Sequence, residues 1–295
     1  MIDDFFNTYR DAFKAIIEQK KDIFKTLIGP FIILFVIDLL FTLGTYSVLA
    51  AGSGNMNNLV GNIYKVGSLS SVVILLNGYI LAYISLRLYK LFMFSDKTPF
   101  ALHMLLPKTS GEKAFLTIAS CPFILSAIAF QLPGLLHTKS VFFSMFGFFI
   151  VIGILIGYIA YLAFIISCPF IFPSKAKDSQ SRVSVIYHLS DGYRLKILLT
   201  YIASLIGLYI ISSILGILIS LAMLPLMWLT TIIPSLEYLF FIILFFLYIA
   251  VNSLCYIAFI ALINKVICIY FEESESKNSK VLLRIEKEIE DNQTI

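Results

Sequence analysis

The chain has 295 residues, of which 59% are hydrophobic and only 14% are charged, and its mean hydropathy is +0.93. Soluble globular domains are about 45–50% apolar and about 25% charged, so this composition excludes an ordinary soluble protein. The net charge is only +4, and we expect no nucleic-acid partner.

Six long apolar runs dominate the sequence. A run of about 18 or more apolar residues is typical of a transmembrane helix, whereas a membrane β-barrel shows alternating segments of about ten residues. Because these runs are apolar on every side, we predict an all-α membrane protein with six transmembrane helices. The predicted spans are Gly29–Ala51, Val66–Phe94, Lys113–Pro133, Val141–Phe172, Leu195–Leu224 and Leu236–Phe271.

The N-terminal segment, residues 1–28, is amphipathic. Aromatic residues such as Phe5 and Phe13 recur at near-helical spacing, and charged residues such as Lys14 fill the other face. A helix with one apolar stripe and one charged face lies in the plane of the membrane interface. We therefore predict an interfacial helix with Phe5, Phe13 and Phe24 at the headgroup boundary.

Two later segments repeat this design. Thr98-Pro99 suits a helix start, since proline is tolerated in the first turn, and Pro107 would end that helix. The third segment is Val183–Leu189, which precedes the turn Ser190-Asp191-Gly192. We predict three units, each an interfacial helix followed by a two-span hairpin. The alternative is that these are the amphipathic pieces found beside the spans of any multispan protein.

Several residues predict where the spans start, bend and end. Thr109 and Glu112 fit a capping box before the third span. The echoed stretches "SCPFIL" and "SCPFIF" place Pro122 inside the third span, where it would kink the helix, and Pro169 near the end of the fourth. Broken helices mark substrate sites in transporters, but prolines are also ordinary in membrane helices.

Basic residues predict which side faces the cytoplasm. Twenty of the 22 Lys and Arg residues lie before the first span, at the junction of spans two and three, at the junction of spans four and five, and at the far end of the sixth. Only Lys65 and Lys139 lie in the other three connections. Lys and Arg collect on the cytoplasmic side of short loops. We therefore predict that both termini are cytoplasmic.

A family resemblance rests on two stretches. One is the turn before the fifth span, with Ser190, Gly192, Tyr193, Arg194 and Lys196, and the other is "LINKVICIYFEE" at the end of the sixth span. With the basic amphipathic N-terminus, they resemble the membrane domain attached to some glycerophosphoryl diester phosphodiesterases and related six-span bacterial proteins. The resemblance implies a six-span fold over most of the chain. It does not carry the phosphodiesterase activity, because that catalytic barrel takes about 250 residues.

Asp38 is the acidic residue that lies well inside a predicted span. A charge there costs at least ~2.5 kcal/mol on insertion scales, and such residues often mark a substrate path or a proton relay. The alternative is a neutral or hydrogen-bonded carboxyl that joins two helices. Asn77 and Asn252 are the candidate partners in neighbouring spans.

Four cations at the predicted cytoplasmic ends of the spans are candidates for binding anionic lipid headgroups. They are Arg87, Lys90, Arg194 and Lys196. Long basic side chains near helix ends can also snorkel to the interface without binding any one lipid. The positive-inside distribution alone would then explain their positions.

Reactive motifs are not evident in the sequence. His103, His137 and His188 lack an obvious set of further metal ligands, and a zinc site needs three or four. The four cysteines read as small apolar residues of the spans. We therefore expect neither an enzyme nor a cofactor or metal site.

The domain plan places an interfacial segment at residues 1–28, the transmembrane domain at 29–272 and a cytoplasmic tail at 273–295. The tail reads as a polar linker and then a short amphipathic helix, so Lys280–Ile295 is the candidate site for a protein partner. We expect a non-enzymatic protein that organises the bilayer or holds a membrane partner, in the inner membrane of a bacterium. The alternatives are a small transporter that uses Asp38 and, last, an interfacial lipid enzyme.

Overall fold

The computed structural model describes residues 2–52, 56–136, 141–177, 183–232 and 237–291, and within these ranges the chain is helical without any β-strand. Six of the helices are long and apolar enough to cross a membrane. The prediction of an all-α, six-span membrane protein is therefore confirmed. The six are α2 (Lys20–Gly52), α3 (Met56–Phe94), α4 (Ser110–Leu136), α5 (Val141–Ser167), α8 (Arg194–Ile232) and α9 (Glu237–Asp291).

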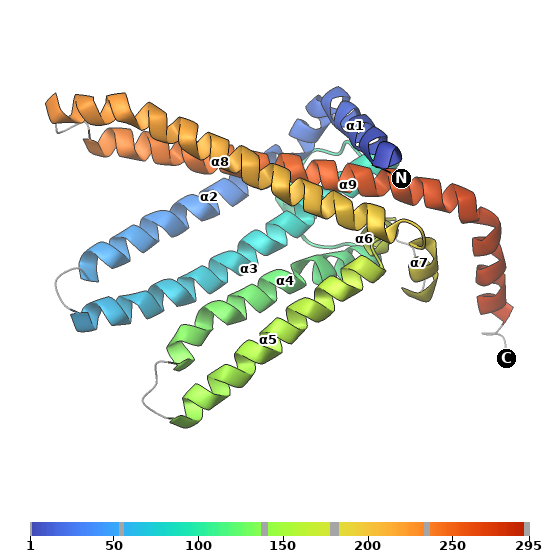
Figure 1. Cartoon of the computed structure of the whole chain (residues 1–295), viewed down its shortest axis with the longest axis horizontal. Coiled ribbons are helices and arrows are strands. Elements are labelled where there is room, and N and C mark those ends of the chain that lie inside the picture. Colours follow the sequence, from blue (N-terminus) through green and yellow to red (C-terminus); the bar gives the residue numbers. More distant parts are fainter. Residues whose placement is uncertain (1, 53–55, 137–140, 178–182, 233–236, 292–295) are drawn as a thin grey trace.

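The spans form three successive antiparallel hairpins, α2–α3, α4–α5 and α8–α9, whose tips lie at the same end of the molecule (Figure 1). Helix α3 is central, because it packs against α2, α4 and α9. Helices α5 and α8 are peripheral, and only 6% of the residues in the most apolar stretch of each helix are buried. Their apolar surfaces are therefore left to lipid or to other membrane helices.

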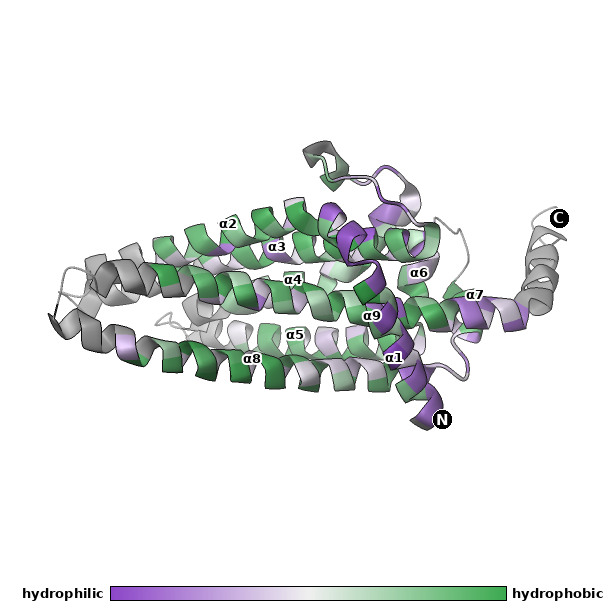
Figure 2. Cartoon of the chain, turned by 90° about the horizontal axis from the view of Figure 1, so that it is seen from above, coloured by the Kyte–Doolittle hydropathy of each residue, from purple (hydrophilic) through white to green (hydrophobic). Residues whose placement is uncertain are grey.

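The buried core lies at the end opposite the hairpin tips. On α3 the buried residues run mainly from Ile80 to Phe92, at the end of that helix. They meet Phe115 at the start of α4 and Tyr270 near the end of α9. Figure 2 shows apolar residues along the spans and hydrophilic residues on α1 and on the part of α9 just after its apolar run. The helices are thus held together most firmly at the end that carries the charged residues.

The interfacial elements differ from the prediction in one segment. Helix α1 (Ile2–Glu18) and helix α7 (Val183–Leu189) lie where amphipathic helices are expected, and a short α6 (Ile171–Ala176) follows α5. Between α3 and α4, however, the chain forms only a 3₁₀ turn, Leu102–Leu105. The physical reason is that Asp96 accepts a hydrogen bond from the Thr98 N–H (3.0 Å) and Arg87 holds the Thr98 carbonyl (2.7 Å).

Two helix boundaries also depart from the predicted domain plan. The first break falls at Gln19, so residues 20–28 are continuous with the first span rather than with the interfacial helix. At the other end, α9 stays helical through Ser274, where a polar linker was predicted. The Ser274 hydroxyl donates to the Leu189 carbonyl (2.6 Å), which anchors this part of α9 on α7.

The structure contains the predicted end of the fourth span and part of the predicted capping box. Helix α5 ends at Ser167, just before Pro169. The Glu112 N–H donates to the Thr109 hydroxyl (3.2 Å), which is one half of the predicted capping box. The Glu112 carboxylate also accepts from the Lys108 N–H (2.6 Å). The four cysteines are free, as small apolar residues would be, and are buried or half-buried: Cys121, Cys168, Cys255 and Cys268.

Candidate functional site

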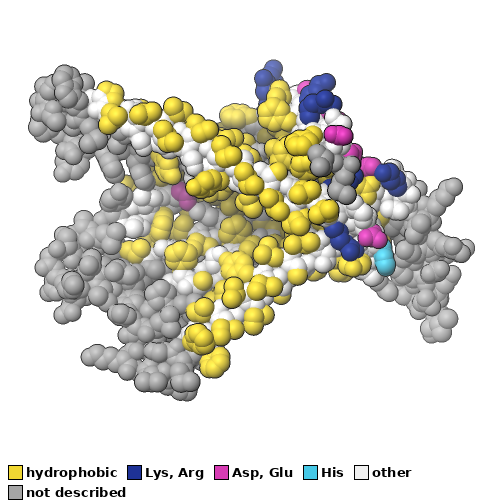
Figure 3. Space-filling view, in the orientation of Figure 1, with side chains coloured by type: hydrophobic (Ala, Val, Ile, Leu, Met, Phe, Trp, Pro, Cys, Tyr) yellow, Lys and Arg dark blue, Asp and Glu magenta, His cyan; other side chains and the backbone are white. Residues whose placement is uncertain are grey.

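Helix α1 presents three different faces. One face packs against α9 and the start of α8, with Ala12 fully buried and the Tyr9 hydroxyl 2.5 Å from the Ser204 hydroxyl. The next face is an exposed apolar stripe made of Phe6, Phe13 and Ile17, which we call the α1 stripe and which is 64%, 56% and 49% exposed. The remaining face carries the charged residues, and Figure 3 shows charged side chains gathered toward this end of the molecule.

The three aromatic residues predicted at the headgroup boundary differ in the structure. Phe13 and Phe24 are exposed, as insertion among lipid headgroups requires. Phe5 is half-buried, with its ring centroid 5.5 Å from that of Tyr9, and Phe6 stands on the exposed stripe in its place. The helical spacing alone does not distinguish these neighbours, because the stripe borders the packed face.

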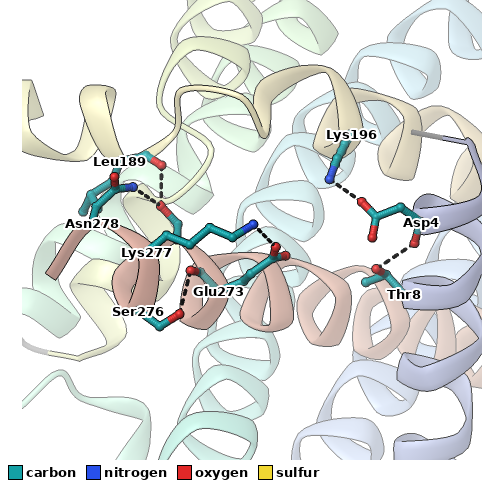
Figure 4. Close-up of polar contacts among 9 residues, drawn as sticks. Asp4, Thr8, Leu189, Lys196, Glu273, Ser276, Lys277 and Asn278 are labelled. Atoms are coloured by element: carbon teal, nitrogen blue, oxygen red, sulfur yellow. Dashed lines mark hydrogen bonds and ion pairs between the residues drawn. The ribbon is translucent and has the colours of Figure 1, made fainter.

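An ion pair connects α1 to the start of α8 (Figure 4). The Lys196 ammonium forms an ion pair with Asp4, and Thr8 donates to the Asp4 carbonyl (2.9 Å). The hydrogen bond and charge of Lys196 lower the pKa of the Asp4 carboxyl below its usual value. Beside it, Lys277 and Glu273 pair along α9 (2.5 Å). The orientation of α1 is therefore set by charged contacts as well as by its apolar face.

Arg194 and Lys196, two of the predicted headgroup ligands, already have protein partners. The Arg194 guanidinium carbon lies 3.7 Å from the centroid of the Tyr187 ring, and its Nη2 donates to the Tyr187 carbonyl (2.9 Å). Lys196 pairs with Asp4. In the structure both side chains hold interfacial helices in place, and lipid binding by either one stays a prediction.

Arg87 and Lys90, the other two predicted headgroup ligands, lie one turn apart at the end of α3. Arg87 is buried and donates to the Asp96 carboxylate (3.0 Å) and to the Thr98 carbonyl. Lys90 forms an ion pair with Glu112 of α4. The two ion pairs therefore tie the end of α3 to the loop after it and to the next span.

These ion pairs line a polar pocket of about 150 Å³ between α3, the 3₁₀ turn and α4. Three cations face it, Arg87, Lys90 and Lys108, together with the carboxylates of Asp96 and Glu112. Burial alone would raise the pKa of Asp96, but hydrogen bonds from Thr98 and the nearby Arg87 guanidinium outweigh it and lower the pKa. Asp96 is therefore ionised at neutral pH. Leu86, Met104 and Leu116 supply apolar wall.

Inside the membrane layer, Asp38 has one of its two predicted partners. The Asn77 amide donates to the Asp38 carboxyl at 2.5 Å, which joins α2 to α3. Asn252 is half-buried on α9, and among the described residues no hydrogen bond connects it to Asp38. The Asn77 side-chain oxygen is buried without a hydrogen-bond partner. The pair can thus join helices, with one acceptor still open to a proton donor or a cation.

One polar contact in the core escapes the sequence analysis. Asn264 is buried on α9, and its amide donates to the Ser85 hydroxyl of α3 (2.8 Å). Asn264 stands beside Lys265, near the end of the last apolar run, and for this reason reads as a solvated residue. Helix α9 continues beyond Asn264 and keeps this residue on its packed side. A longer sixth helix would therefore have predicted the burial of Asn264.

No set of three or more His, Cys, Asp or Glu side chains that could hold a metal ion occurs in the part of the chain that the structure describes. Comparisons with family models, curated proteins and solved structures find no match to the chain. The resemblance to phosphodiesterase membrane domains accordingly stays a prediction.

Proposed function

We propose that this integral membrane protein is a non-enzymatic organiser of the bilayer at its predicted cytoplasmic face. The observation that carries the proposal is the α1 stripe. Phe6, Phe13 and Ile17 are exposed on a helix whose orientation is fixed by Tyr9, Ala12 and the Asp4–Lys196 pair. An apolar stripe held rigidly at the level of the headgroups acts as a shallow wedge, and binding of such helices is sensitive to membrane curvature.

The exposed helices α5 and α8 could also bind a membrane protein partner. Helices α5 and α8 leave much of their apolar surface exposed, so they can contact lipid or the helices of a membrane partner. The C-terminal segment Lys280–Ile295 offers a further protein contact, and its helix is described as far as Asp291. We place this activity in the inner membrane of a bacterium.

The function can be tested by reconstituting the full chain into vesicles that contain anionic lipid. We expect wild-type protein to shift the vesicle diameters, measured by cryo-electron microscopy, toward smaller values. Replacing the α1 stripe by Asp (Phe6→Asp, Phe13→Asp and Ile17→Asp) should abolish the shift, because charged side chains do not enter the apolar layer.

The matched control is Asn7→Asp combined with Lys14→Asp. It changes the net charge by the same amount but alters only the polar face of α1. Vesicles should still shrink with this control. If wild-type protein and the stripe variant give the same diameters, α1 does not act as a wedge and the proposal fails.

A second candidate function is transport through a site at Asp38. It is favoured by the open acceptor on Asn77 beside the carboxyl of Asp38. Intramembrane carboxyls often mark proton or ion paths. The contact that the structure shows, a hydrogen bond between two adjacent spans, is also what helix association requires, and for this reason transport ranks second.

A further inference from the structure

Two cavities adjoin on the surface formed by α3, the 3₁₀ turn and α4. The first is the polar pocket described above. The second is a groove of about 420 Å³ along α4, and the two cavities share Pro107 and Leu116 as lining residues. From Glu112 in the pocket to Ile124 in the groove, α4 advances twelve residues, which is about 18 Å along a helix. The groove therefore leads from the charged end of the molecule toward the apolar layer.

Two residues that line the polar pocket each carry a buried hydrogen-bond donor for which the described residues provide no partner. Tyr83 is only 2% exposed and Arg87 only 8%, and both line the pocket. The Tyr83 hydroxyl and the Arg87 Nε are buried without a hydrogen-bond partner. Unsatisfied buried donors are rare and unfavourable in native proteins. Because the two residues are four apart on α3 they share a face, so one ligand could accept from both.

The charges around the pocket indicate the kind of ligand. Arg87, Lys90 and Lys108 oppose Asp96 and Glu112, which leaves one excess positive charge. A phosphodiester carries a single negative charge and two free oxygens, so it would balance the charge and offer one acceptor to each open donor. A phosphate monoester would bring nearly two negative charges toward the two carboxylates.

The groove indicates where the rest of the ligand lies. Leu116 and Ile124 form an apolar wall, and Ile124 is 45% exposed. An acyl chain can pack along this wall, because the wall is itself apolar. We propose that the pocket and groove bind one anionic phospholipid, with its phosphodiester at Tyr83 and Arg87 and an acyl chain along α4. This site uses other residues than the α1 stripe, so it does not depend on the bilayer-organising function.

The first test is native mass spectrometry of the full chain after reconstitution with phosphatidylglycerol or phosphatidylcholine. We expect one retained phosphatidylglycerol, with weaker retention of phosphatidylcholine, whose headgroup has no net charge. Tyr83→Phe should weaken retention at least about tenfold, because it removes a hydrogen bond to a charged group. Folding should be unaffected, since that hydroxyl has no hydrogen-bond partner among the residues that the structure describes.

Tyr270→Phe is the matched control. It removes another buried tyrosine hydroxyl, but Tyr270 lies on α9 and does not line either cavity. This variant should retain phosphatidylglycerol like wild type. The assignment is overturned if wild-type protein retains no lipid, or if Tyr83→Phe and Tyr270→Phe behave alike.

The second test separates a lipid from a soluble anion. Ser120→Phe should fill the groove and reduce lipid retention while leaving the polar pocket intact, whereas Ser213→Phe on the exposed surface of α8 should not. Inorganic phosphate, or the deacylated headgroup glycerophosphoglycerol, should fail to displace the bound lipid. Displacement by either one at the lipid's own concentration would show a soluble-anion site and overturn the lipid proposal.

Discussion

Asp38 shows how far a single residue can be interpreted from sequence. Its depth in the first span predicts a neutral or paired carboxyl, and the structure pairs it with Asn77 of α3. Between two candidate amides, however, the sequence could not choose, because the choice depends on which spans are neighbours. Helix α2 packs more extensively on α3 than on α9. The relative position of the spans therefore selected Asn77 over Asn252.

Replacing Asp38 by Asn tests whether the pair is structural. If it only joins α2 to α3, Asp38→Asn should keep thermal stability within about 1 kcal/mol, since hydrogen bonds between membrane helices average ~0.6 kcal/mol. Asp38→Leu, which leaves Asn77 without any partner, should be less stable than Asp38→Asn. Thermal unfolding in detergent measures both. A stable, correctly assembled Asp38→Asn protein with a null phenotype in cells would instead support the transport function.

The pKa of Asp96 predicts a dependence of stability on pH. Because hydrogen bonds from Thr98 and the charge of Arg87 lower its pKa in the folded protein from 3.8, this carboxylate stabilises the fold above the unfolded-state pKa. That contribution is lost as the pH falls through the lowered pKa. The difference in stability between wild type and Asp96→Asn should thus be present near pH 6 and shrink below about pH 4. A difference that stays constant to about pH 3 would contradict the predicted role of the ion pair.

At the scale of elements, hydropathy predicts the spans but not the residues at which the helices begin and end. The first helix breaks at Gln19, and α9 continues through Ser274, where its hydroxyl makes a tertiary contact with the Leu189 carbonyl. Likewise, Thr98-Pro99 has the local signal for a helix, yet Asp96 and Arg87 bind the backbone of Thr98 and hold it in an irregular loop. The local preference for a helix at Thr98-Pro99 is overridden because the buried Arg87 guanidinium takes the Thr98 carbonyl as an acceptor.

Helices α3 and α4 approach closely at Gly78, which gives an element-scale prediction. A Cβ atom placed there would lie 2.2 Å from the Phe123 ring, whereas at Gly153 of α5 it would meet nothing within 4 Å. Gly78→Ala should therefore destabilise the protein by about 1–3 kcal/mol, as overpacking does. Gly153→Ala, the control, should leave stability unchanged or raise it, since alanine favours the helix. Thermal unfolding of both variants would refute the close approach if their effects are equal.

For the whole molecule, the charge pattern and the fold agree on which ends lie together. Twenty of the 22 basic residues lie on α1 and the start of α2, from the end of α3 to the start of α4, from α6 to the start of α8, and on the second half of α9. Three hairpins bring all four segments to one end, opposite the hairpin tips (Figure 1). The tight core at the charged end was not predictable from hydropathy, because burial against protein and burial in lipid select the same apolar residues.

The orientation in the membrane is the final prediction. Basic residues are retained on the cytoplasmic side, so the end with α1, α6 and α7 should face the cytoplasm. Single cysteines, introduced after the four native cysteines are replaced, can be labelled in intact cells with a reagent that does not cross the membrane. We expect labelling at Asn57, His137 and Thr231, and none at Lys108, Lys177 and Ser279. Of these, His137 lies outside the described residues.

Lysis supplies the control for this experiment, because permeabilised cells should allow labelling at Lys108 and Lys177 as well. The decisive position is Lys177, which follows α6 and pairs with Glu275 of α9 (2.9 Å). Since that contact places Lys177 beside the end of the last span, labelling there from outside would require α9 to end on the outer side too. The six-span orientation, and with it a cytoplasmic α1 stripe, would then be wrong as a whole.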